Sequence, residues 1–176
     1  MLKKFPLLFL LLYAIELFAH PHTFIEVYPT IEVKNEKTTK IHFQWLIDEM
    51  TSSMLIMEFD ENGNGRIDND ENNYVYDTYF LPLKDYNFYT DIQVDKKTQF
   101  FPEPKNFQSS IKNNRICYSF DIDINYSIKN TKFDFGDEDF FVAMVLKDEF
   151  VNVKGSDFIV SDMDNDFYFG YRLELK

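Results

Sequence analysis

The stretch Asp60–Glu71, which reads DENGNGRIDNDE, has the residue types and spacing of a calcium-binding EF-hand loop. That template asks for oxygen ligands at loop positions 1, 3, 5, 7, 9 and 12 and for glycine at position 6. Gly65 stands at position 6. The six ligand positions are filled by Asp60, Asn62, Asn64, the backbone carbonyl of Arg66, Asp68 and Glu71. The spacing predicts a Ca²⁺ site, and the alternative interpretation is an acidic surface turn.

This loop has no second EF-hand loop in the sequence with which to pair. The later acidic run at 162–166 lacks both the glycine and the closing glutamate. Three of the ligand residues carry a formal charge, which favours weak binding, as in calcium-rich exterior compartments. Mg²⁺ needs stricter octahedral geometry and suits the loop less well. The sequence therefore predicts a structural calcium site rather than a calcium sensor.

The first nineteen residues have the pattern of a cleavable Sec signal peptide. Two lysines precede a short apolar run at 5–13, and Ala19 offers a small residue before the cut. The run is shorter than the ~20 residues that span a bilayer. We expect residues 1–19 to be removed, leaving an exported mature chain of 20–176 that does not itself span the membrane.

All three histidines lie early in that mature chain. Cleavage would make His20 the first residue, so that its amine and imidazole are available together, with His22 close behind. Pro21 has no amide N–H, which blocks the square-planar mode that uses a deprotonated second amide. Imidazole and amine ligands suit Zn²⁺, Ni²⁺ or Cu²⁺, and zinc or nickel is the prediction for this site. The alternative is an ordinary exposed N-terminal tail.

Three further residues are weaker candidates for the same transition-metal site. His42 lies in an expected strand, and Asp48 and Glu49 follow that strand directly. A hairpin would return this strand beside the first one, which is how these side chains could join His20 and His22. The alternative for His42 is an ordinary strand residue.

Composition bears on the kind of partner and on how the fold is stabilised. The 176 residues carry 30 acidic and 18 basic side chains, a net charge of -12, which argues against a nucleic-acid partner. The hydrophobic fraction of 45% and aromatic fraction of 18% are enough for a substantial core. Cys117 is the one cysteine, so no intramolecular disulfide is possible.

The hydrophobic pattern predicts a mainly β fold. Helices are expected at 48–59 and 72–81, the second ending at Pro82, on either side of the acidic loop. Alternation and β-branched residues predict strands at 24–33, 40–47, 88–94, 107–111, 115–127, 140–146, 157–161 and 167–175. We expect a single domain over 20–176, an antiparallel β-sandwich with an EF-hand-like helix–loop–helix insert at about 48–82.

Four segments in this order resemble a known family. They are Ala19-His20-Pro21-His22, Trp45-Leu46-Ile47-Asp48-Glu49-Met50, the loop Asp60–Glu71 and Asp137-Glu138-Asp139-Phe140-Phe141-Val142. Together they resemble the family called domain of unknown function 1007, described as the periplasmic component of an uncharacterised ABC-type transport system. The resemblance implies a periplasmic location, an inner-membrane nickel/cobalt-type metal permease as partner, and a role in divalent transition-metal traffic. Glu138-Asp139 replaces the Asp-Pro that members often have before the late aromatic pair.

Three functional hypotheses follow from these features. The first is a non-enzymatic accessory protein of transition-metal transport that binds Zn²⁺ or Ni²⁺ near its N-terminus and Ca²⁺ in the loop. The second is a Ca²⁺-stabilised structural or interaction protein of the cell envelope without a transition-metal role. A hydrolase is third, because no nucleophile–base spacing is evident in the sequence.

Overall fold

The computed structural model describes residues 22–139, 141–164 and 169–176. Residues 1–19, predicted to be a signal peptide, lie outside these residues, as do His20 and Pro21. The strands are β1 (Thr23–Lys34), β2 (Lys37–Ile47), β3 (Thr90–Val94), β4 (Lys97–Gln99), β5 (Lys105–Lys112), β6 (Arg115–Ser127), β7 (Thr131–Phe135), β8 (Val142–Val145), β9 (Asn152–Lys154), β10 (Phe158–Asp164) and β11 (Phe169–Leu175). The helical elements are α2 (Glu49–Phe59), α3 (Asn69–Val75), the π-helical turn η1 (Tyr76–Phe80) and the 3₁₀ segments η2 (Leu81–Tyr89), η3 (Ile128–Asn130) and η4 (Asp148–Phe150).

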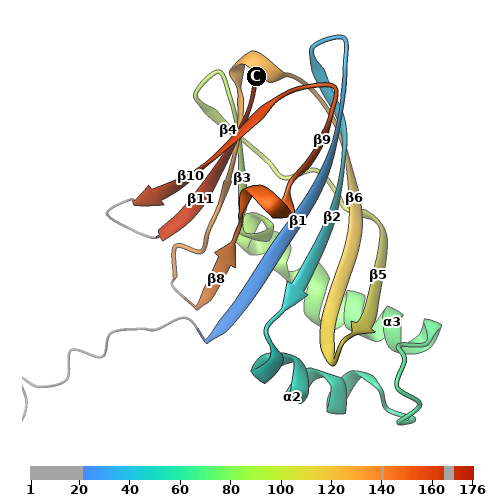
Figure 1. Cartoon of the computed structure of the whole chain (residues 1–176). Coiled ribbons are helices and arrows are strands. Elements are labelled where there is room, and N and C mark those ends of the chain that lie inside the picture. Colours follow the sequence, from blue (N-terminus) through green and yellow to red (C-terminus); the bar gives the residue numbers. More distant parts are fainter. Residues whose placement is uncertain (1–21, 140, 165–168) are drawn as a thin grey trace, which may run out of the picture.

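The strands form two sheets, which confirms the mainly β prediction (Figure 1). The first sheet has the order β5-β6-β2-β1-β8, with β9 also paired to β1, and the second has the order β10-β11-β7-β3-β4. Most pairs are antiparallel, as expected. Strand β1 is the exception, because it pairs in parallel with both β8 and β9.

The first sheet has one apolar face and one polar face because its long strands alternate. Along β2 the residues Ile41, Phe43 and Trp45 are buried, whereas His42 and Gln44 point the other way. Strand β6 alternates in the same phase, and its observed bounds are those predicted. His42 therefore lies on the polar face of this sheet.

The helical stretch from α3 to η2 fills the space behind the apolar face. Phe80 is fully buried, and its ring lies 4.9 Å from that of Phe120 and 6.1 Å from that of Trp45. The prediction that Pro82 ends this helix is wrong: Pro82 lies in the first turn of η2, where a missing N–H is tolerated. Among the described residues, no helix has the length and apolar character needed to cross a membrane.

Candidate functional site

The acidic loop Asp60–Glu71 connects α2 to α3. Phe59, the last residue of α2, is buried against Tyr79, with ring centroids 4.8 Å apart. Ile67 is partly buried and packs against the hydrophobic core, which fixes the middle of the loop. Gly63 and Gly65 have φ values of +67° and +78°, a conformation that glycine adopts without strain. The loop is thus anchored by the residue that precedes it and by Ile67 near its middle.

The ligand side chains of the loop point toward one another. Asp60 accepts backbone hydrogen bonds from Asn64 and Gly65, at 2.9 and 2.8 Å. Asn62 and Asn64 each donate from the side-chain amide to Asp68, at 2.9 and 3.0 Å. Asn62 also donates to Glu71 Oε1 at 3.2 Å. Five of the six predicted ligand residues therefore meet in one hydrogen-bonded cluster.

Arg66, the sixth predicted ligand, is expected to use its backbone carbonyl, and its backbone N–H donates to Asn64 Oδ1 at 2.8 Å. Glu71 is only 9% exposed and its Oε2 accepts the backbone N–H of Asp68 at 2.7 Å, which caps the start of α3. Among residues 22–139, 141–164 and 169–176, no group of three or more His, Cys, Asp or Glu side chains is gathered closely enough to hold a metal. Three of the six predicted ligands are two asparagine side chains and one backbone carbonyl, which a group of His, Cys, Asp and Glu side chains does not include.

The described part of the N-terminal candidate site lies at the start of α2. His22 is exposed, its backbone carbonyl accepts from Thr51 Oγ1 at 3.4 Å, and its ring stacks on Phe141. Asp48 is occupied as the N-cap of α2, because its two carboxylate oxygens accept the N–H groups of Thr51 and Phe24, each at 3.0 Å. Burial works to raise the pKa of Asp48, but these backbone hydrogen bonds outweigh it and lower the pKa. Glu49 is exposed in the first turn of α2.

The structure places His42 far from His22. His42 pairs with Thr30 in the β1–β2 ladder, eight residues along β1 from His22. At ~3.3 Å per residue that is about 26 Å. The hairpin does return β2 beside β1, but the register carries His42 toward the opposite end. His42 and His22 therefore cannot ligate one ion together.

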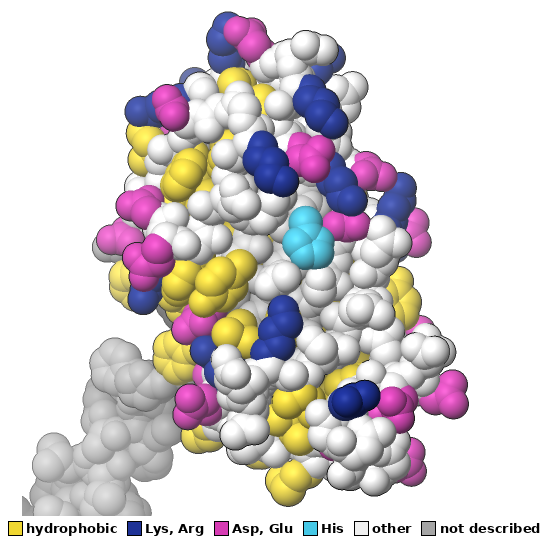
Figure 2. All heavy atoms as spheres, turned by 45° about the vertical axis from the view of Figure 1, so that its right-hand side comes forward, with side chains coloured by type: hydrophobic (Ala, Val, Ile, Leu, Met, Phe, Trp, Pro, Cys, Tyr) yellow, Lys and Arg dark blue, Asp and Glu magenta, His cyan; other side chains and the backbone are white. Residues whose placement is uncertain are grey.

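His42 belongs instead to a polar cluster on the open face of the first sheet. Its Nδ1 lies 2.8 Å from Asp121 Oδ1, and Asp121 Oδ2 accepts from Lys40 at 3.0 Å and Asn106 at 2.8 Å. Burial opposes ionisation of Asp121, but the hydrogen bonds from Asn106, His42 and Lys40 outweigh it and lower its pKa to about 2. Figure 2 shows a histidine side chain at the surface of the molecule, with basic and acidic side chains near it.

Ser119 completes a serine–histidine–aspartate arrangement that the sequence spacing did not reveal. Its Oγ lies 3.4 Å from His42 Nε2. The backbone of Ser119 does not suit the oxyanion-binding role of a hydrolase site. Ser119 lies on the interior strand β6, paired with Gln44 on one side and Gln108 on the other, so its backbone N–H is used in the sheet rather than for an oxyanion. We interpret the cluster as a structural polar network.

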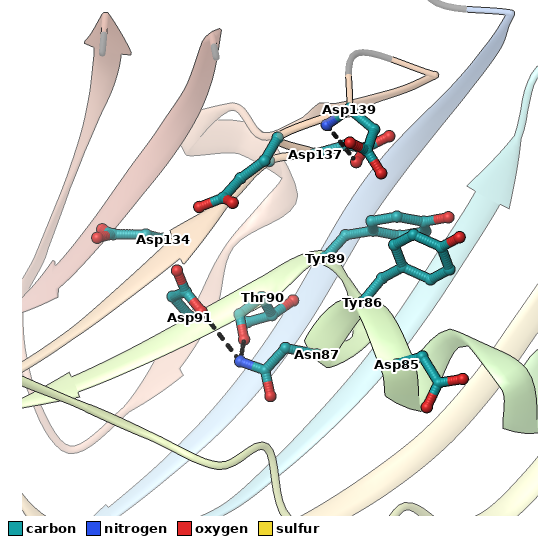
Figure 3. A pocket seen from close by; sticks show the side chains of 11 residues that line it. Asp85, Tyr86, Asn87, Tyr89, Thr90, Asp91, Asp134, Asp137 and Asp139 are labelled. Atoms are coloured by element: carbon teal, nitrogen blue, oxygen red, sulfur yellow. Dashed lines mark hydrogen bonds between the residues drawn. The ribbon is translucent and has the colours of Figure 1, made fainter. Parts of the chain in front are cut away.

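A separate cavity of about 380 Å³ lies beside β3 and β7 and is rich in acidic side chains (Figure 3). Its inner carboxylates are already partnered. Asp134 accepts two hydrogen bonds from Arg172, at 2.6 and 2.7 Å, and one from Gln93 at 2.8 Å. Asp91 accepts from Asn87 at 3.0 Å. The geometry therefore assigns no ligand to this cavity.

Asp137, from the late segment of the family pattern, forms part of the cavity wall. It is 6% exposed and accepts the backbone N–H groups of Asp139, Phe141 and Val142 at 2.9–3.0 Å. Across the cavity, burial together with Asp137, Tyr86 and Asp139 raises the pKa of Tyr89 to about 12. Asp137 thus holds the backbone that leads into β8.

Comparison with known proteins gives a family and two relatives. The family model described as "Protein of unknown function (DUF1007)" matches residues 5–166. An uncharacterised protein of Haemophilus influenzae is 27% identical over 152 residues, covering 81% of this chain and 70% of that protein. An uncharacterised 15.5 kDa protein in the trpE 3' region of Spirochaeta aurantia is 30% identical over 95 residues, covering 52% of this chain and 68% of that protein.

Proposed function

We propose that this chain, which belongs to the family described as protein of unknown function (DUF1007), is an exported accessory protein of divalent transition-metal transport. In this proposal α2, the loop Asp60–Glu71 and α3 act as an EF-hand-like calcium site. The mature N-terminus captures Zn²⁺ or Ni²⁺ in the periplasm and passes it to or from an inner-membrane metal permease. No enzymatic step is part of this function.

The observation that carries the calcium part is the convergence of the loop side chains. Asp60, Asn62, Asn64, Asp68 and Glu71 lie in one cluster, and Gly65 has the positive φ that lets the chain turn back. Hydrogen bonds between these groups occupy oxygen atoms that a hard cation would otherwise use. Replacing them with six to eight oxygen contacts to one Ca²⁺ would need side-chain movement but no change in the path of the chain.

The transition-metal part rests on a smaller set of residues than the sequence suggested. His42 is engaged by Asp121 and distant from His22, and Asp48 is used as a helix cap. The proposed ligands are therefore the amine and imidazole of His20, the imidazole of His22, and Glu49 from the adjacent start of α2. Since imidazole must be neutral to bind, we expect this affinity to fall below about pH 6.

Calorimetric titration of the mature protein with Zn²⁺ and with Ni²⁺ tests this part. We expect binding in the wild type, its loss in the His20→Ala/His22→Ala variant, and no change in the control His42→Ala. Unchanged affinity in the double variant would refute the N-terminal site.

The engagement of His42 and Asp48 favours a second function, a Ca²⁺-stabilised envelope protein without a transition-metal role. That function predicts calcium binding in the same calorimeter and no heat with either transition metal. The two proposals are thus separated by one set of titrations on one protein sample.

A further inference from the structure

Helix α2 presents three methionines to solvent. Met50, Met54 and Met57 are 68%, 57% and 78% exposed, whereas Ser52 and Phe59 of the same helix are buried. Figure 1 shows α2 at the end of the first sheet, with no described element beyond its outer side. The three thioether side chains therefore form one open surface, which we call the methionine face.

The choice of methionine at these positions is unusual. A solvent-facing helix surface ordinarily carries polar or charged residues, and methionine is among the residue types most often buried. The other two methionines that the structure describes, Met144 and Met163, are buried. Fold stability does not require apolar side chains on the outer side of α2, so the methionine face asks for another explanation.

Helical geometry gathers the three sulfur atoms. Successive residues of a helix are rotated by ~100° about its axis. Met54 is four residues and Met57 seven residues after Met50, which places all three side chains within an arc of about 60° around the axis. The outermost pair are ~10.5 Å apart along the axis at ~1.5 Å per residue, with Met54 between them. Methionine is unbranched and has three rotatable bonds, so the sulfur atoms can converge over the middle residue.

We propose that Met50, Met54 and Met57 form a binding site for Cu(I). Thioether sulfur is a soft ligand that selects Cu(I) over harder divalent ions. The charge of the helix suits a cation, because α2 holds Glu49 and Glu58 and has no lysine or arginine. The site is separate from the calcium loop and from the imidazoles, and it does not depend on the proposed function.

Protonation gives this site a distinctive signature. A thioether has no proton to exchange in the physiological range, so Cu(I) affinity should be the same at pH 7 and pH 5. An imidazole site would weaken over that interval, because the unperturbed histidine pKa is about 6.5. The pH profile therefore separates copper on the methionine face from copper on His20 and His22.

The test is an anaerobic titration of the mature protein with Cu(I) in competition with a chromophoric Cu(I) chelator. Wild type is expected to take one Cu(I) per chain at both pH values, with sulfur neighbours in the X-ray absorption spectrum. The triple variant Met50→Leu/Met54→Leu/Met57→Leu should lose this copper to the chelator. Leucine preserves the apolar surface and the helix propensity, so circular dichroism and the melting temperature should match wild type.

Two matched variants make the test decisive. His20→Ala/His22→Ala should keep the Cu(I), and Met163→Leu, which changes a buried methionine, should keep it too. The proposal is overturned if wild type fails to compete for Cu(I), if the triple leucine variant holds copper as wild type does, or if the histidine variant alone loses it. Retention by the triple variant would leave the methionine face as an apolar contact surface.

Discussion

Calcium binding to the loop should raise the thermal stability of the mature protein by an amount that Glu71→Gln removes. A ligand that binds only the folded state stabilises by ~2.7 kcal/mol at a concentration of about 100 times Kd. With three charged ligand residues, Kd should lie near the weak end of the EF-hand range, on the order of 10⁻⁴ M. For a chain of this size each kcal/mol is worth roughly 2–4 °C, so 10 mM Ca²⁺ should raise Tm by roughly 5–11 °C.

Glu71→Gln is the most specific substitution for this test because glutamine can keep part of the hydrogen bonding that Glu71 has without metal. Its oxygens accept from the Asp68 N–H and the Asn62 amide, and glutamine keeps one acceptor oxygen for the first of these. The variant should therefore fold nearly as well as wild type without calcium, while lacking the bidentate carboxylate at position 12. Its melting temperature should respond little to calcium.

Differential scanning fluorimetry in chelator, in 10 mM Ca²⁺ and in 10 mM Mg²⁺ provides the measurement. The matched control is Glu61→Gln, which removes the same charge from an exposed, non-ligand position of the same loop. It should keep the calcium shift. The reasoning is refuted by an equal calcium shift in the Glu71→Gln protein, or by an equally large shift with Mg²⁺ in wild type.

Three further changes test the structural assignments. Asp121→Asn should destabilise the protein by about 1 kcal/mol at pH 7, a figure discounted for partial solvent screening. Because the folded pKa of Asp121 is lowered to about 2, this contribution is present above the unfolded pKa of ~3.9 and is lost as the pH falls toward 2. Urea unfolding should therefore show a smaller difference in stability between variant and wild type at pH 2.5. Ser52→Ala should cost ~1–3 kcal/mol in urea unfolding, because it leaves a buried backbone N–H of β6 without an acceptor, whereas exposed Ser53→Ala should cost far less. Asp137→Ala strands three backbone N–H groups and should lower Tm clearly, whereas Glu138→Ala at the neighbouring exposed position should leave it close to wild type.

What the sequence could predict was local. Strand β6 alternates without interruption, so its bounds Arg115–Ser127 were predictable from the residues alone. The predicted ligands of the loop lie within twelve consecutive residues, so their convergence follows from spacing. Strand β7, Thr131–Phe135, was missed because five residues between turn signals carry little periodic information, although it is the central strand of the second sheet.

What the sequence could not predict depends on register and on contacts distant along the chain. His42 contacts Asp121 of strand β6, and Asp121 in turn accepts a hydrogen bond from Asn106 of strand β5. Their shared polar face was visible in the alternation of β6, but the offset that sets His42 opposite Asp121 was not. The same limit applies to the parallel pairing of β1 with β8 and β9, which no local pattern encodes.

Helix α2 connects the proposed calcium and copper sites. Its last backbone hydrogen bond is donated by the N–H of Asp60 to the carbonyl of Ile56, and the side chain of Asp60 is the first proposed ligand of the loop. Calcium on Asp60 would therefore hold the last turn of α2, the turn that carries Met57. If this raises the affinity for Cu(I) by some factor, thermodynamic linkage requires that Cu(I) raise the affinity for Ca²⁺ by the same factor. Measuring each titration with and without the other ion gives this factor twice, and a factor of one in both titrations would show that the helix does not couple the two sites.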